Sequence, residues 1–151
     1  MEIILAENHG FCYGVKRAVE MANEAAEGKG KSYTLGPIIH NPQVVGRLES
    51  KGVSPIQEVA DIDEGTMIIR SHGVGPAIYA EAEEKGLHIL DATCPHVKKA
   101  QQDAKSVIED GMTLVILGEK NHPEVKSINL WANNKGIIIE DEESAKKLQI
   151  V

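Results

Sequence analysis

Aromatic side chains are scarce in this sequence, at 3% of its 151 residues, although hydrophobic residues make up 42%. A chain of this length can bury a substantial core, and that core must be built from Ile, Val, Leu and Ala. Stacked aromatic rings are therefore not expected to organise the fold.

Long runs of one residue class are also missing. The chain has 16 Lys and Arg residues and 23 acidic residues, which gives a formal net charge of -7, and no basic run exceeds two residues. Nucleic acid is therefore not an expected partner. The longest apolar runs, such as 114–117 and 137–139, are far shorter than a membrane span, and no charged leader with an apolar core opens the chain. We expect no membrane segment and a soluble cytoplasmic protein.

Only two cysteines occur, Cys12 and Cys94. A structural disulfide is not expected in a chain without signs of secretion, so metal binding or thiol chemistry is the preferred interpretation.

A recurring order of elements predicts an α/β fold. Helices are predicted at 15–27, 79–85 and 97–110, each followed by glycine and then by strands at 32–35, 87–90 and 112–117. A further strand is predicted at 3–5 and a last helix at 142–147. This alternation is typical of mainly parallel sheets flanked by helices. We expect two small lobes, residues 1–94 and an incomplete second lobe at 95–151, because the last residues look like the start of a further element.

The first cysteine lies between two glycines, in the segment HGFCYGVKRAV of residues 9–19. The pattern predicts a strand end followed by a helix, where α/β proteins commonly bind ligands. Glycines let backbone amides approach an inorganic group, and the positive helix end favours the thiolate that ligates metal. The alternative is that Cys12 is a small buried residue that fills a turn.

The second cysteine has the same setting, in ILDATCPHVKK of residues 89–99. Pro95 fits the first helical turn, which places Cys94 at or next to the helix cap. Two cysteines at equivalent turns indicate a shared ligand, and an iron-sulfur cluster uses thiolates with such helix dipoles and backbone donors.

Three histidines form a second group of candidates: His40, His72 and His122 each follow a predicted strand and are bounded by Gly or Pro. We expect them to converge on one pocket, where they could hold a diphosphate and move protons. The alternative for each is an ordinary hydrogen-bonded loop histidine. The remaining histidines lack this framing and are interpreted as solvated or structural: His9, His88 and His96.

Glu124, two residues after His122, would open the helix that follows Pro123. It could act there as a general acid or base, or it could simply be an acidic residue favoured by the helix dipole. Spacing alone does not separate these roles.

Five motifs in order resemble the 4-hydroxy-3-methylbut-2-enyl diphosphate reductase (IspH/LytB) family. They are GFCYGVKRAV at 10–19, HNPQVV at 40–45, RSHGV at 70–74, DATCP at 91–95 and HPEV at 122–125. The resemblance covers nearly the whole chain but only about the first half of the family's polypeptide.

The resemblance implies roles for these residues. Cys12 and Cys94 would be two of three cysteine ligands of a 4Fe-4S cluster whose unique iron binds the substrate hydroxyl. The three histidines would line the diphosphate pocket, and Glu124 would relay protons to the departing hydroxyl. Electrons would come from a ferredoxin or flavodoxin type donor, and the products would be isopentenyl and dimethylallyl diphosphate.

The chain also departs from the family. The resemblance implies that the family's third cluster cysteine and its Ser-x-Asn diphosphate motif lie in a third lobe, for which this sequence has no residues left, so we interpret the chain as a truncated form. Ser127 and Leu130 stand where the family usually has glycines.

Other functions remain open from the residues alone. One is a non-catalytic α/β fragment that binds diphosphate, or zinc through Cys12, Cys94 and histidines. A thiol enzyme is another, although no obvious base pairs with either cysteine. A nucleotide-binding domain is disfavoured because no Gly-x-Gly-x-x-Gly or Walker motif follows the first strand.

Overall fold

The structure, a computed structural model, describes residues 2–7, 9–28 and 30–148. Within these ranges one sheet has the order β2-β1-β3-β4 and another pairs β5 with β6. Every strand pair is parallel, which confirms the α/β class with parallel sheets. The strands are β1 Ser32–Leu35, β2 Val53–Ile56, β3 Thr66–Ile69, β4 His88–Asp91, β5 Val115–Leu117 and β6 Ile137–Ile139.

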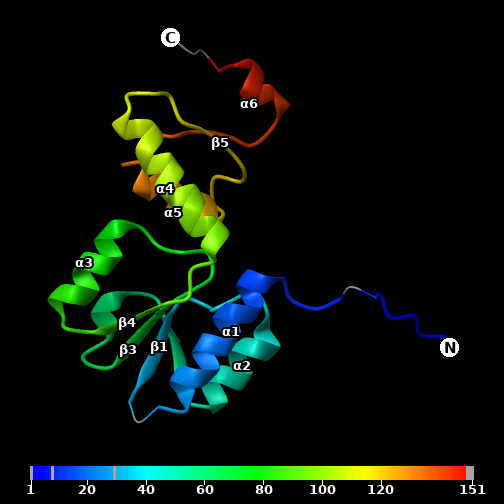
Figure 1. Ribbon diagram of the computed structural model, residues 1–151, viewed down its shortest axis with the longest axis vertical. Coiled ribbons are helices and arrows are strands. Elements are labelled where there is room, and N and C mark those ends of the chain that lie inside the picture. Colours follow the sequence, from blue (N-terminus) through cyan, green and yellow to red (C-terminus); the bar gives the residue numbers. More distant parts are fainter. Residues whose placement is uncertain (1, 8, 29, 149–151) are drawn as a thin grey trace.

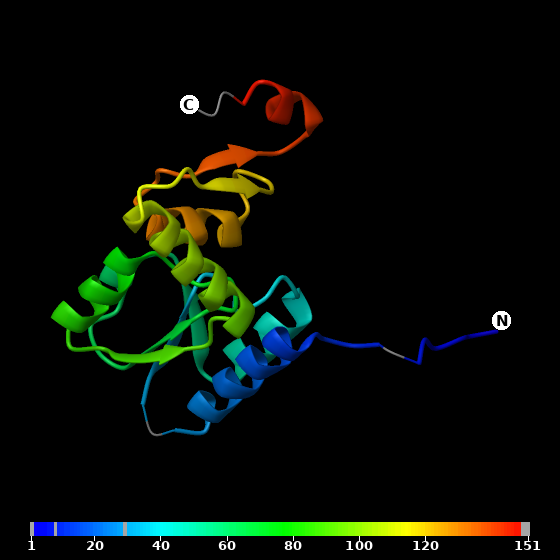
Figure 2. The ribbon, with the colours of Figure 1, turned by 45° about the horizontal axis from the view of Figure 1, so that its top comes forward.

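Helices cover both faces of the larger sheet. Figure 1 shows α1 and α2 on one side of it and α3 on the other. The helices are α1 Tyr13–Ala26, α2 Pro42–Ser50, α3 Pro76–Glu84, α4 Pro95–Glu109, α5 Pro123–Trp131 and α6 Glu142–Lys146, with a 3-10 turn η1 at Val59–Asp61. Figure 2 shows α4 and α5 on the side of β5 and β6 that faces the larger sheet.

The central strand β3 explains why the two faces are covered. Ile68 packs in a buried cluster with Ala18 and Ala22 of α1. Met67 and Ile69 point the other way and pack in a second buried cluster, which includes α3. Complete burial of such side chains contributes roughly 1.5–3 kcal/mol each. The loops at the carboxyl ends of these strands are therefore attached to a rigid support.

The predicted division at residues 94 and 95 falls between β4 and α4, so the two sheets lie on either side of it. This boundary stays a prediction. Among the described residues, no helix combines the length and the apolar character needed to cross a bilayer.

The strand predicted at 3–5 is wrong. These residues have no regular secondary structure, and Ile3, Ile4 and Leu5 are 73%, 84% and 75% exposed. Figure 1 shows this segment extending away from the sheets. An apolar β-branched run becomes a strand only when a neighbouring strand pairs its backbone groups, and no described strand does so here. Cys12 therefore follows an extended segment and not a strand end.

Candidate functional site

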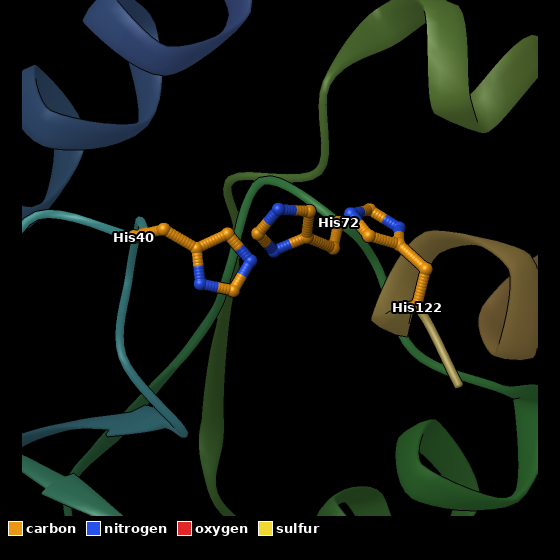
Figure 3. A group of neighbouring side chains, drawn as sticks. All are labelled: His40, His72 and His122. Atoms are coloured by element: carbon orange, nitrogen blue, oxygen red, sulfur yellow. The ribbon is translucent and has the colours of Figure 1, made fainter. Parts of the chain in front are cut away.

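The structure brings the three candidate histidines together. His40 lies in the loop between β1 and α2, His72 in the loop after β3, and His122 at the start of α5. Figure 3 shows their rings turned toward one another. The ring centroids are 4.7 Å apart for His40 and His72, 5.6 Å for His72 and His122, and 6.2 Å for His40 and His122. One ring nitrogen from each lies within 4.8 Å of the others. We call this group the histidine cluster.

His72 is the central and most perturbed member of the histidine cluster. Its Nδ1 is buried and has no hydrogen-bond partner among the described residues. Burial, followed by the charges of His40, Arg70 and His122, lowers the pKa of His72 to about 4. The ring is therefore neutral at pH 7 and carries an unsatisfied polar atom, which a ligand could satisfy.

The tautomer of His122 follows from its role as the cap of α5. Its Nδ1 accepts a hydrogen bond from the backbone N–H of Glu124 at 3.2 Å. Since a backbone N–H can only donate, the neutral ring must carry its proton on Nε2. His122 is thus a hydrogen-bond donor at Nε2, the form suited to an anionic acceptor.

Buried polar contacts fix α5 to the His72 loop. The Ser127 hydroxyl lies 2.8 Å from the carbonyl oxygen of His72 and 2.9 Å from that of Glu124. Gln101 of α4 donates to Ser127 Oγ at 3.2 Å, and both side chains are only 2% exposed. Trp131 Nε1 donates to the carbonyl oxygen of Val74 at 2.9 Å. These bonds set the separation between the His72 loop and the His122 helix end.

The two cysteines occupy matching positions at helix starts. Cys12 is the N-cap of α1 and is exposed, Cys94 is the N-cap of α4 and is half-buried, and both are free thiols. A Cβ added to Gly14 would lie 2.5 Å from Cys94 Sγ. The Cys94 thiol therefore packs against the first turn of α1, immediately after Cys12. Two thiols near positive helix ends fit two ligands of a thiolate-bound cluster.

Arg17 connects the two cysteine turns. Its guanidinium donates to the carbonyl oxygens of Thr93 at 3.2 Å and Asp91 at 3.4 Å, across the gap from α1 to the end of β4. The backbone N–H of Cys94 also donates to the carbonyl oxygen of Ser71 at 2.9 Å. The role of Arg17 could not be predicted from the motif that contains it, because these bonds depend on how α1 packs.

A cavity links the cysteine turn of α1 with the histidine cluster. It measures about 230 Å³, and its lining includes His40 and His72 together with Phe11 and Val15, the residues around the Cys12 turn. Whether both thiols face one shared cavity stays a prediction, as do the roles assigned to the histidines, the cysteines and Glu124.

Replacing Gly14 with Ala should displace the Cys94 thiol. The added methyl group overlaps Sγ, and overpacking of this kind costs typically 1–3 kcal/mol of unfolding free energy. Gly46→Ala is the matched control, because nothing lies within 4 Å of a Cβ there and alanine favours a helix by roughly 0.5–1 kcal/mol. Urea unfolding and the rate of Cys94 labelling check both. Equal changes in unfolding free energy for the two variants would contradict the close approach of Cys94 Sγ to residue 14.

Comparison with known protein families gives one matching family model, described as "LytB protein", over residues 3–151. The chain is 51% identical over 148 residues to a 4-hydroxy-3-methylbut-2-enyl diphosphate reductase from Geobacter metallireducens, covering 98% of this chain and 52% of that protein. It is 50% identical over 151 residues to the protein of the same name from Pelobacter propionicus, covering 100% and 54% respectively.

Solved structures agree with these sequence matches. A structure of (E)-4-hydroxy-3-methyl-but-2-enyl diphosphate reductase superposes with a TM-score of 0.82 at 47% identity, covering 96% of this chain and 53% of that one. The reductase from Plasmodium falciparum has a TM-score of 0.91 at 32% identity, covering 96% of this chain and 46% of that one. The chain thus spans about half the length of the relatives it matches.

Proposed function

Because the chain belongs to the LytB protein family, we propose that it forms part of a reductase that removes the hydroxyl group of 4-hydroxy-3-methylbut-2-enyl diphosphate. The products would be isopentenyl and dimethylallyl diphosphate. The histidine cluster beside the cysteine turns is the observation that carries this proposal, since it would join a diphosphate-binding site to a thiolate site.

In this proposal the histidine cluster binds the diphosphate. His122 donates from Nε2, because its Nδ1 is occupied by the Glu124 backbone. His72 is neutral and has a buried ring nitrogen without a partner among the described residues, which a diphosphate oxygen or its proton could satisfy. His40 is exposed at the open side of the cluster. Binding would thus depend on hydrogen bonds from the ring nitrogens of the histidine cluster to the diphosphate oxygens.

Cys12 and Cys94 would hold a 4Fe-4S cluster together with a third thiolate outside these residues. That group supplies two one-electron transfers, which a ferredoxin or flavodoxin type donor would provide. Gly14 lets the Cys94 thiol approach α1, and Arg17 holds the Cys94 turn in place. Both residues would keep the two thiols at a fixed separation.

Glu124 would deliver protons to the departing hydroxyl. Its described contacts run through the backbone, with its N–H bonded to His122 and its carbonyl oxygen to Ser127. The carboxylate is therefore available for proton transfer while its position is fixed by the start of α5.

Zinc binding is the competing interpretation, and one observation bears on it. The histidine cluster has the proximity of a metal site. A zinc ion at Nε2 of His122 would have to displace the proton from that nitrogen. The proton could not move to Nδ1, because Nδ1 accepts the backbone N–H of Glu124. Among the described residues, the group of three potential ligands that lie close together contains histidines and no cysteine, which favours the diphosphate proposal over a mixed cysteine and histidine zinc site.

Pyrophosphate binding tests the anion site directly. Changing His40, His72 or His122 to Ala should each weaken binding to residues 1–151 by about 1–3 kcal/mol, because a hydrogen bond to a charged group is lost. Isothermal titration calorimetry measures the effect. His88→Ala is the matched control, since His88 lies at the amino end of β4, away from the histidine cluster.

A second variant separates capping from binding at position 122. Asn is a favoured N-cap, so His122→Asn should keep α5 intact while removing the ring donor. It should therefore lose pyrophosphate affinity without losing thermal stability. Unchanged pyrophosphate affinity in all variants of the histidine cluster would indicate that these residues are ordinary loop histidines.

A further inference from the structure

A second cavity lies on the other side of the His72 loop. It measures about 330 Å³ and is lined by the segment 73–75, by α5 and by residues from the larger sheet. No member of the histidine cluster lines it. One wall is apolar and is formed by Leu35, Val74, Ile78 and Leu130. The charged residues of its lining are Arg70 and Lys126, both cationic.

Arg70 is the unusual feature of this cavity. It is half-buried at the end of β3, and its Nε is buried without a hydrogen-bond partner among the described residues. No ion pair involves it within the described part of the chain. Burial lowers the pKa of Arg70. A desolvated cation without a counter-ion costs free energy that a bound anion would recover.

The guanidinium packs against the loop after β1. A Cβ on Gly36 would lie 2.7 Å from Arg70 Nη1, and Gly36 has a φ of 71°, which disfavours other residues. The guanidinium therefore lies directly against the backbone of the loop after β1. A planar guanidinium is suited to bidentate contact with phosphate oxygens.

Two helix starts add to the positive potential. Gly75, the N-cap of α3, and Pro123, the first residue of α5, both line the cavity. Each helix start carries partial positive charge. In a chain with a formal net charge of -7, a cavity lined by two cations and two helix starts, with no acidic residue in its lining in the described part of the chain, is locally selective for anions.

We propose that this cavity binds a small phosphate ester with a short apolar body. Two cationic side chains and two helix starts favour a dianionic phosphate over a singly charged carboxylate. The apolar wall would take the organic part of the molecule, and inorganic phosphate would leave that wall uncovered. The site is separate from the proposed diphosphate site, so each can be tested without the other.

An NMR titration of residues 1–151 with n-butyl phosphate tests the proposal. The backbone amides of Gly36, Gly73 and Gly75 should shift saturably. Binding should be roughly 10-fold tighter than that of n-butyrate and tighter than that of inorganic phosphate, because only butyl phosphate offers both the dianion and the apolar group. No saturable shift of these amides, or equal affinities for the three probes, would overturn the proposal.

Variants complete the test. Arg70→Met keeps an unbranched apolar stem in place of the aliphatic part of the side chain and removes the charge, so butyl phosphate binding should weaken roughly 10-fold or more. Lys126→Met, an exposed position, should weaken it several-fold without affecting folding. Lys147→Met, an exposed lysine outside the cavity, is the control. His40→Ala should leave butyl phosphate binding unchanged. Unchanged binding in both the Arg70 and Lys126 variants, or loss in the His40 variant, would overturn the site.

Discussion

Anaerobic reconstitution of residues 1–151 with iron and sulfide is expected to give a labile cluster, well below one per chain, and negligible reductase turnover. The sequence contains two cysteines, and the family resemblance implies a third thiolate ligand. Cys12 is also exposed at the start of α1, so one side of the site would be open to solvent and oxidants. Adding the family's remaining half, on the same chain or as a partner, should restore both cluster and turnover.

Iron content per chain, visible absorbance and turnover with a chemical reductant measure these outcomes together. In the completed enzyme, Cys12→Ser and Cys94→Ser should each abolish a stable cluster. His88→Ala is a control that should leave it intact, because His88 lies at the opposite end of β4 from the Cys94 turn. Robust activity from residues 1–151 alone would show that the third thiolate is dispensable and that the ligand assignment is wrong.

Much of the fold was predictable because the local signals agree with the packing. The strand at 32–35 is β1, and the helix predicted at 97–110 is α4. Gly86 and Gly111, expected to end helices, have φ values of 68° and 73°. The helix α2 was not predicted, although a favoured N-cap residue, Asn41, precedes it in the sequence. In the structure Asn41 caps α2 by accepting the Val44 N–H at 3.1 Å. The strand predicted at 3–5 failed because a strand also needs a neighbour.

The histidine cluster was predictable because parallel strands direct their following loops to one edge of a sheet. The contacts that give it its chemistry were not. The hydrogen bond from the Ser127 hydroxyl to the His72 carbonyl oxygen joins α5 to the loop after β3. It therefore depends on how α5 packs against that loop. The tautomer of His122 likewise depends on the orientation of its ring as a helix cap. Sequence spacing contains neither piece of information.

A large loss of turnover is expected from Glu124→Gln in the completed enzyme. Gln keeps the shape of the side chain and removes the proton that it can donate, so turnover should fall by roughly 10²-fold or more. The backbone bonds of residue 124 to His122 and Ser127 do not involve the carboxylate and should persist. Pyrophosphate affinity should therefore stay unchanged, which separates a proton-transfer defect from a binding defect.

Stability provides the second separation for this variant. Loss of a carboxylate from the first turn of α5 should cost only about 0.3–1 kcal/mol of unfolding free energy, too little to explain a large loss of turnover by unfolding. Glu119→Gln is the matched control: Glu119 is an exposed carboxylate in the loop that precedes α5, and its described bond to His122 runs through its backbone carbonyl. It should keep full turnover. Full activity of Glu124→Gln would remove this residue from the proton path and leave an ordinary acidic residue at the start of α5.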